Sequence, residues 1–343
     1  MTLISNTLSS RASASRSRTA VEWPTLSLLA LVYSGWLAAV MFSPVMPVWL
    51  LLPILVFLTA LHASLQHEAL HGHPTRHALS NEILVGLPLG LFIPYRRFKH
   101  LHLRHHCNEN LTDPYDDPES FYRARADWTG LSGPLRFLLR FNNTLLGRLL
   151  IGPSLAVTAF YRSEWARLHR GRGQARRVIG AWVRHIAGVA IVVTALVYSG
   201  FPLWLYGVGV AYPAMALLML RTYAEHQAAE TADARTVIIE ASPFFALLFL
   251  NNNLHFVHHK FPNAAWYQLP ALYRNGFACV GEEDGHYRIF GYGTLFKRYF
   301  LRPKEAVSHP YRRRADTVPH TARQECGSGQ HRLASALAGD HSD

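Results

Sequence analysis

The sequence predicts an all-α integral membrane protein with four transmembrane helices in two hairpins, additional interfacial helices and a histidine-rich cytoplasmic cap. Composition supports this fold class, because 50% of the residues are hydrophobic and only 16% are charged, a high apolar share for a chain of ordinary length. The apolar residues also gather in long blocks that occur in pairs. A buried helix of a soluble protein would explain any one block, but four blocks in two pairs favour a membrane bundle.

Each predicted hairpin consists of two apolar segments that are long enough to cross about 30 Å of hydrocarbon. The two segments of the first hairpin contain no Asp, Glu, Lys or Arg. The second hairpin is interrupted by Arg184 and His185, so these side chains must face protein or water. The predicted spans are residues 26–42 and 48–66 in the first hairpin, and residues 186–199, extended back to 178, and 201–220 in the second.

Two further apolar segments are too short or too interrupted to cross the membrane. Residues 83–95 contain Pro88, Gly90 and Pro94, and residues 241–250 contain Pro243. Irregular backbone is tolerated at membrane depth only where protein or water satisfies its polar groups. We therefore expect re-entrant or interfacial helices at both places.

The distribution of arginine predicts the orientation of the spans. Basic residues are frequent in the N-terminal segment and between the two hairpins, whereas the links at 43–46 and 199–202 are uncharged. We therefore expect both ends and the long connecting stretch to be cytoplasmic. The chain divides into a flexible basic tail (1–24), a membrane domain (25–310) and a disordered tail (311–343). The formal charge of +12 fits anionic lipid headgroups; without a nucleic-acid motif, we expect no nucleic-acid partner.

Histidine has the most informative spacing of any residue type in the chain. One HxxxH pair is followed by two HxxHH triplets, at positions His67 and His71, then His102, His105 and His106, then His255, His258 and His259. With 20 histidines in 343 residues, an HxxHH match arises by chance about 0.07 times per chain, so two copies carry information. Residues three and four apart share one face of a helix, so each group can direct its imidazoles at one point.

Eight converging imidazoles are too many for one metal ion. Zinc takes four ligands in structural sites and three plus water in catalytic sites, so the pattern predicts two metal ions. Imidazole binds iron, copper, nickel and zinc, so the ligand type alone does not fix the element. The cysteines, Cys107, Cys279 and Cys326, form no cluster motif. Cys107 follows the first triplet directly, and we prefer a buried thiol beside the site to a ligand there.

Imidazoles that bind a metal need hydrogen-bond acceptors that fix their tautomer. Acidic and amide side chains stand near the histidines in the sequence. The candidates for this supporting role are Glu68, Asp113, Asp116, Asp117, Glu119, Asn252 and Asn253. The alternatives are a solvated acidic turn, marked by Pro114 and Pro118, and ordinary helix capping by the asparagines.

The order and spacing of the three histidine groups resemble the histidine boxes of the membrane fatty acid desaturase and hydroxylase superfamily. His67-Glu68-Ala69-Leu70-His71-Gly72 is similar to the first box of that superfamily. His258-His259-Lys260-Phe261-Pro262, followed by Trp266-Tyr267-Gln268-Leu269-Pro270, is similar to the proline and leucine pattern after its third box. The resemblance covers roughly residues 25 to 300. It is specific for the superfamily and says little about the substrate.

The resemblance implies a non-haem centre of two iron ions at the cytoplasmic membrane face, which uses O2 and two electrons to attack an unactivated C–H bond. Superfamily members often carry one more histidine ahead of the third box, and His226 stands at that place; a capped helix end is the alternative. The chain has no haem motif, no cysteine cluster and no dinucleotide-binding glycine motif. The resemblance therefore implies an external electron donor of the ferredoxin, rubredoxin or cytochrome b5 type.

The implied substrate is an acyl chain or another lipid that enters from the bilayer. Aromatic residues are candidates for the walls of its tunnel, with core packing as the alternative, at Phe92, Tyr95, Phe244, Phe245, Phe249 and Trp266. The favoured function is a fatty acid desaturase that introduces a double bond into an acyl chain. The alternatives are a di-iron hydroxylase, monooxygenase or ketolase acting on an alkane, carotenoid, sterol or acyl lipid, and a membrane metal transporter or sensor. Transport sites usually lie near the middle of the bilayer, whereas these histidines lie at its inner edge.

Overall fold

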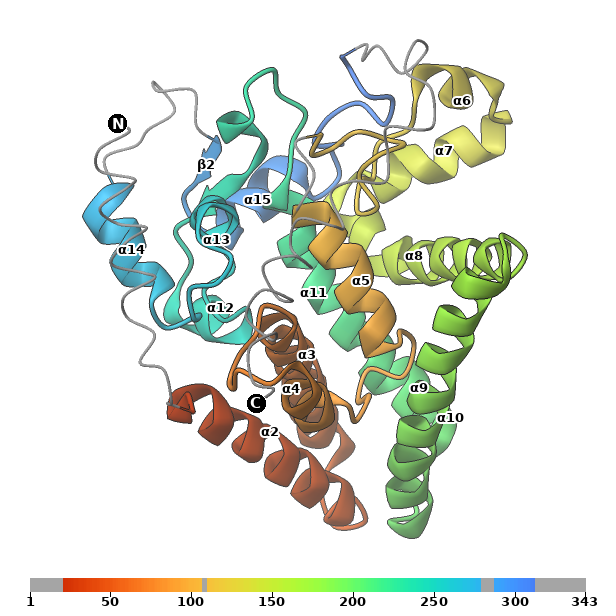
Figure 1. Cartoon of the computed structure of the whole chain (residues 1–343), viewed down its shortest axis with the longest axis vertical. Coiled ribbons are helices and arrows are strands. Elements are labelled where there is room, and N and C mark those ends of the chain that lie inside the picture. Colours follow the sequence, from red (N-terminus) through yellow and green to blue (C-terminus); the bar gives the residue numbers. More distant parts are fainter. Residues whose placement is uncertain (1–20, 107–109, 279–286, 312–343) are drawn as a thin grey trace, which may run out of the picture.

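The computed structural model describes residues 21–106, 110–278 and 287–311, and it is mostly helical (Figure 1). Among these residues, four helical runs have the length and composition of membrane spans. The first hairpin consists of α2 (Trp23–Met41) and α3 (Val48–Leu70). The second consists of α9 (Arg172–Tyr198) and the run Leu203–Glu225, formed by α10 (Leu203–Tyr206), the π-helix η1 (Gly207–Ala211) and α11 (Tyr212–Glu225). The predicted all-α membrane fold is therefore confirmed.

Three of the spans extend further than their apolar segments at the ends that carry the histidines. Helix α3 continues past residue 66 to Leu70, α9 begins at Arg172 rather than at 178, and the last run ends at Glu225 rather than at 220. A helix can continue with polar residues where it leaves hydrocarbon, because its backbone hydrogen bonds are internal. These extensions carry polar side chains into the cap.

The apolar pattern does not predict the long helix α8 (Leu145–Leu168), which lies between the two hairpins. It follows α6 (Arg125–Gly130) and α7 (Gly133–Asn142). Taken together, α7 and α8 are long and apolar enough for a span, but they bend by 115°, as in a broken span or a re-entrant loop. In Figure 1, α8 lies across the upper end of α9. Charged residues interrupt its apolar face, and one of them, Glu164, is buried in an ion pair with Arg97 of α5 (Tyr95–His106).

The apolar segment 83–95 is not one helix, because α4 (Ala78–Val85) ends early and residues 86–94 are irregular. Side chains from other helices satisfy the carbonyls of this irregular stretch. The Tyr206 hydroxyl donates to the Leu89 carbonyl (2.9 Å), the Tyr161 hydroxyl donates to that of Phe92 (2.9 Å), and His185 Nε2 lies 2.7 Å from that of Leu91. Residues 241–250 contain only the short helix α12 (Pro243–Leu248), which cannot span a bilayer.

A small cap completes the fold at the end of the bundle where α5 lies. Beyond α5 and α12 it contains η2 (Asp233–Arg235), α13 (His255–Lys260), α14 (Leu269–Gly276), α15 (Tyr292–Tyr299) and a parallel pair of strands, β1 (Val237–Ile239) and β2 (Tyr287–Ile289). Leu250 and Asn251 have positive φ values of 49° and 55°, and this tight turn redirects the chain from α12 into α13. The predicted tails and all three cysteines lie outside the described residues, except for residues 21–24 and 311.

Candidate metal centre

The structure brings all nine histidines singled out from the sequence to one end of the bundle. Helix α3 and its C-terminal cap carry the first box, α5 the second box, the end of α11 carries His226, and α13 the third box. Their nitrogen atoms form two groups, in each of which the ligand atoms all lie within 4.8 Å of one another. The five-histidine group consists of His67, His71, His102, His106 and His258, and the four-histidine group of His105, His226, His255 and His259.

Helical periodicity explains how the boxes are divided between the two groups. Residues four apart share a face, so His102 and His106 of α5 enter one group, whereas His105 is turned away and enters the other. In helix α13 the assignment is reversed: His255 and His259, four residues apart, enter the four-histidine group, and His258 enters the five-histidine group. Both helices therefore serve both groups. The groups are adjacent, since the rings of His106 and His259 stack with centroids 4.2 Å apart.

The distances between ring nitrogens match those of ligands on a shared cation. In the five-histidine group His102 Nε2 lies 2.8 Å from His67 Nε2 and 3.0 Å from His106 Nε2. In the four-histidine group His226 Nε2 lies 3.0 Å from both His105 Nε2 and His255 Nε2. Metal–nitrogen bonds of about 2.1 Å at right angles place neighbouring nitrogens about 3.0 Å apart. Each group therefore has the spacing of a coordination shell.

The other ring nitrogen of several of these histidines is held by an oxygen acceptor. His105 Nδ1 lies 2.8 Å from Asp117 Oδ1, His102 Nδ1 lies 2.9 Å from Glu119 Oε1, and His255 Nδ1 lies 3.0 Å from Asn252 Oδ1. His226 Nδ1 faces the Arg235 carbonyl at 3.3 Å. These acceptors require a proton on Nδ1, which leaves a lone pair on Nε2 of the neutral ring.

Lone pairs that converge at 3.0 Å repel each other unless a cation lies between them. In the four-histidine group, His226 and His255 both direct such nitrogens at each other. A hydrogen bond cannot explain this contact when both rings carry their proton on Nδ1. The donor set therefore fits a metal ion with a preference for imidazole.

Burial keeps most of these imidazoles neutral, as metal binding requires. It lowers the pKa of His226 to about 3. Burial, together with neighbouring imidazoles, also holds the pKa of His255, His258 and His259 well below its usual value. His105 differs: burial lowers its pKa, but the carboxylates of Glu119 and Asp117 outweigh burial and raise it to about 9. A metal ion at this group would have to displace a proton from His105.

The predicted supporting residues occupy different positions around the centre. Asp117, Glu119 and Asn252 contact imidazoles, as described above. Asp113 instead accepts from the backbone N–H groups of Tyr115 (2.9 Å) and Asp116 (3.1 Å), so it shapes the acidic turn. Asn253 donates to the Ile239 carbonyl at 2.7 Å and thereby attaches the start of α13 to β1.

Glu68 lies beside the first box but is directed away from its imidazoles. Its Oε1 accepts from the Trp266 backbone N–H at 2.7 Å and lies 3.9 Å from His73 Nε2. His73 Nδ1 in turn lies 2.7 Å from Glu22 Oε1. This group ties the start of α2 and the segment after the third box to the end of α3.

Sequence reasoning missed Glu225, which is buried next to the four-histidine group. Its Oε1 lies 3.5 Å from His255 Nδ1 and 2.8 Å from Nε of Arg221, one helical turn earlier. The available signal was the spacing of an acidic and a basic residue four apart, directly before His226. Glu225 supplements Asn252 as a partner of the His255 ring.

The aromatic residues predicted to line a substrate tunnel differ widely in exposure. Phe249 is completely buried and packs on Tyr292, whereas Phe244 is 55% exposed. The Trp266 indole donates to the Thr25 hydroxyl at 3.2 Å, and Tyr95 is buried. Phe92 and Phe245 are half-buried against the core.

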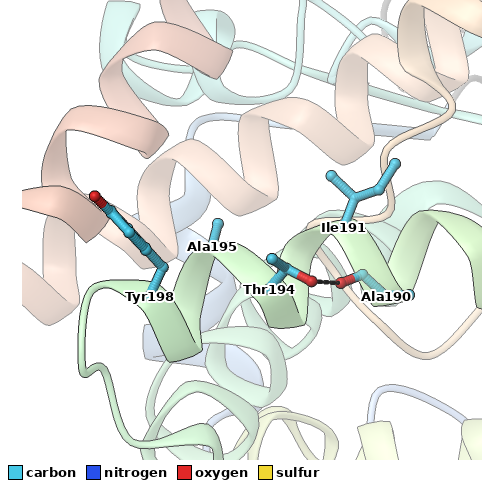
Figure 2. A pocket seen from close by; sticks show the side chains of 5 residues that line it. All are labelled: Ala190, Ile191, Thr194, Ala195 and Tyr198. Carbon is cyan, nitrogen blue, oxygen red and sulfur yellow. Dashed lines mark hydrogen bonds between the residues drawn. The ribbon is translucent and has the colours of Figure 1, made fainter.

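Figure 2 shows an apolar hollow elsewhere, on the membrane-spanning helix α9. It has a volume of about 470 Å³ and is lined by Ala190, Ile191, Thr194, Ala195 and Tyr198. Ile191 and Tyr198 are largely exposed. The Thr194 hydroxyl donates a hydrogen bond to the Ala190 carbonyl at 2.8 Å. These residues lie toward the hairpin link of α9, whereas the histidines lie at the opposite ends of the spans, so the hollow is separate from the metal centre.

The fold and the centre together define a multi-pass membrane protein with a buried histidine site suited to two metal ions. The family model for fatty acid desaturases matches residues 43–291, more than half of the chain and all three histidine boxes. The protein therefore belongs to the fatty acid desaturase family. No curated protein is similar enough to the chain to count as a match. Family membership supports an oxidoreductase of the desaturase or hydroxylase type.

Asp117 allows a sharp test of the supporting contacts. Its Oδ1 accepts from His105, and its Oδ2 accepts from the Thr112 backbone N–H at 2.8 Å. An amide at this position would place an NH2 group against one of these donors, so Asp117→Asn should lower metal affinity or turnover by about 10–100-fold. Asp233→Asn is the matched control, because Asp233 pairs with Lys260 on the surface. Equal metal titrations for the two variants would show that Asp117 does not support the centre.

Proposed function

We propose that the protein is a membrane-bound di-iron desaturase that uses O2 to introduce a double bond into an acyl chain. The observation that carries this proposal is the convergence of nine imidazoles in two adjacent groups with the spacing of coordination shells. Membership of the fatty acid desaturase family supports iron as the metal. Histidine ligation also fits ferrous and ferric iron by its chemistry.

The residues of the chain hold and shield the reactive centre. The five-histidine and four-histidine groups would each hold one iron ion, and a bound iron pair supplies the oxidation of a C–H bond. Asp117, Glu119 and Asn252 keep the Nδ1 proton on their imidazoles and so direct Nε2 inward. His105, His226 and His255 are buried and His259 is partly exposed, so the packing keeps bulk water away from most of the four-histidine group.

The reaction requires two electrons that the chain does not supply. Removal of two hydrogen atoms from adjacent carbons forms the double bond, and O2 together with these two hydrogen atoms, two electrons and two protons becomes two molecules of water. We propose that a small electron carrier of the ferredoxin, rubredoxin or cytochrome b5 type delivers these electrons. The acyl substrate would enter from the bilayer, toward the ends of the spans that carry the boxes.

Product analysis tests the proposed reaction. Lipids from cells that express the chain should contain a new unsaturated acyl group, seen by gas chromatography and mass spectrometry as the loss of two hydrogen atoms. Cells with the His105→Ala variant provide the background. A product that instead gains one oxygen atom would replace the desaturase by a hydroxylase. Metal-loaded protein that gives neither product, with electron donor and lipid supplied, would contradict both reactions.

We also propose that the histidine centre faces the cytoplasm, because arginine is frequent in the stretch that carries the second box and absent from the hairpin links. Single cysteines at Ser43, Ser199 and Ser120, in a background without the three native cysteines, test this orientation. A membrane-impermeant reagent outside intact cells should label positions 43 and 199 and not position 120. Labelling of position 120 alone would reverse the orientation.

A further inference from the structure

A short segment near the C-terminal end of the described chain contacts the surroundings of both histidine groups. We call this segment, Lys304 to His309, the strap. It lies beyond residues 43–291, which the family model matches. It has no helical structure of its own, and its Ser308 forms an isolated parallel bridge with Arg123.

One side of the strap holds the loop that contains Asp117 and Glu119. The Arg123 N–H donates to the Val307 carbonyl at 2.8 Å, and the His309 N–H donates to the Arg123 carbonyl at 2.9 Å. His309 Nε2 also lies 3.2 Å from the Thr112 hydroxyl. These bonds lie at the two ends of the loop. The strap therefore closes the loop that supplies acceptors to His105 and His102.

The other side of the strap holds His226. Lys304 Nζ donates to the His226 carbonyl at 2.5 Å and lies 2.9 Å from Oε1 of the neighbouring Glu305. The Lys304 side chain is only 4% exposed. Three aromatic rings surround its ammonium group at 5.2 to 5.8 Å, those of Phe121, Tyr223 and Tyr287.

His226 needs support from outside its helix. Helix α11 ends at Glu225, and His226 is extended, with φ −130° and ψ 148°. Its carbonyl is therefore not directed along the helix axis, and the bond from Lys304 replaces a helical hydrogen bond. The next residues are held as well, because the Ala228 N–H donates at 2.7 Å to the Tyr122 hydroxyl, which itself donates to Glu305.

We propose that Lys304 is a positioning residue of the four-histidine group. The strap as a whole fixes the position of His226 relative to the loop that contains Asp117 and Glu119. The metal-binding part of this inference rests on the proposed function. Lys304 acts through the backbone of His226 and touches no reacting atom. Because its contacts involve His226 and not the five-histidine group, its loss should affect one metal site more than the other.

The test compares Lys304→Met with Lys297→Met, which removes an exposed lysine of α15. Iron-loaded full-length protein in detergent is mixed with a ferrous chelator, and the release of each iron is followed in time. In Lys304→Met one iron should be released about 10–100-fold faster than in the wild type, while the other keeps its rate. Lys297→Met should release both irons at the wild-type rates. Tyr122→Phe keeps the charge of the strap and should also release one iron faster than the wild type. It replaces Lys304→Met in the test if that variant does not fold.

Hydrogen exchange gives a readout that does not depend on metal. Backbone amides of residues 227–236 should exchange about tenfold faster in Lys304→Met, because Lys304 no longer holds the His226 carbonyl at the start of this segment. Unchanged exchange, or equally faster release of both irons, would overturn the positioning role. If the wild-type chain takes up no metal at all, the proposed function fails, and hydrogen exchange alone then decides whether the strap holds His226.

Discussion

Replacing one histidine of each group is expected to abolish turnover and to remove metal from the group that it belongs to. His258→Ala opens the five-histidine group, and His105→Ala opens the four-histidine group. Each change deletes a proposed ligand atom, so the loss should exceed the about 10–100-fold effect of removing an outer partner. Iron content per chain should fall from about two toward one in each variant.

The matched control for these variants is His169→Ala. His169 lies outside both groups, at the exposed end of α8, and its ring packs on that of Trp165. This variant should keep both metal ions and full turnover. Full activity in His258→Ala or His105→Ala would show that the boxes do not form the reactive centre, whatever metal the protein binds.

Arg97→Met is expected to destabilise the protein by up to about 3–5 kcal/mol, because the buried Glu164 carboxylate loses its bidentate partner and, of its cationic partners, keeps only the more distant Arg167 Nε at 3.7 Å. The Arg97 guanidinium donates from Nε and Nη2 to Glu164 at 2.8 to 3.0 Å, and both side chains are less than 10% exposed. This pair joins α5, which carries the second histidine box, to α8. Thermal unfolding in detergent would measure the loss as a lower Tm.

Two further variants separate charge burial from loss of packing. The double variant Arg97→Met with Glu164→Met should recover most of the stability, since the buried carboxylate is gone and the remaining Arg167 is 21% exposed. Arg96→Met is the matched control, because Arg96 is 40% exposed in its pair with Glu82 and such pairs contribute no more than about 1 kcal/mol. A single Arg97→Met variant as stable as Arg96→Met would show that the buried pair does not hold α8 in place.

The sequence was most informative where structure is local. The spans follow from runs of apolar residues, and the histidine boxes follow from spacings that one helical turn imposes. The apolar pattern did not predict helix α8, because charged residues such as Arg148 and Glu164 interrupt it. These residues are buried by partners from distant segments. A composition pattern counts such residues as exposed, whereas in the folded chain Glu164 pairs with Arg97 and Arg148 lies over the rings of Phe121 and Tyr223.

The surroundings of the centre were harder to predict for the same reason. Asp113 and Asp117 are four residues apart in one acidic turn, yet only the second faces an imidazole in the contacts described above. The path of the turn decides this, and no local rule gives that path. Lys304 and His226 are 78 residues apart in the chain, so their contact depends on how the cap folds. The nine histidines that the fold brings together could be named from the sequence, as could Asp117, Glu119 and Asn252 beside them. Glu225 and Lys304 could not, because their contacts depend on the folded cap.

The most direct test of the central claim is to locate the metal. Crystals of iron-loaded protein, measured at wavelengths on either side of the iron absorption edge, should give two anomalous peaks that are specific for iron. One peak should lie among the five nitrogens of His67, His71, His102, His106 and His258, and the other among the four nitrogens of His105, His226, His255 and His259. A single peak, or iron bound only at the separate cluster of Glu22, Glu68 and His73, would contradict the proposed di-iron centre.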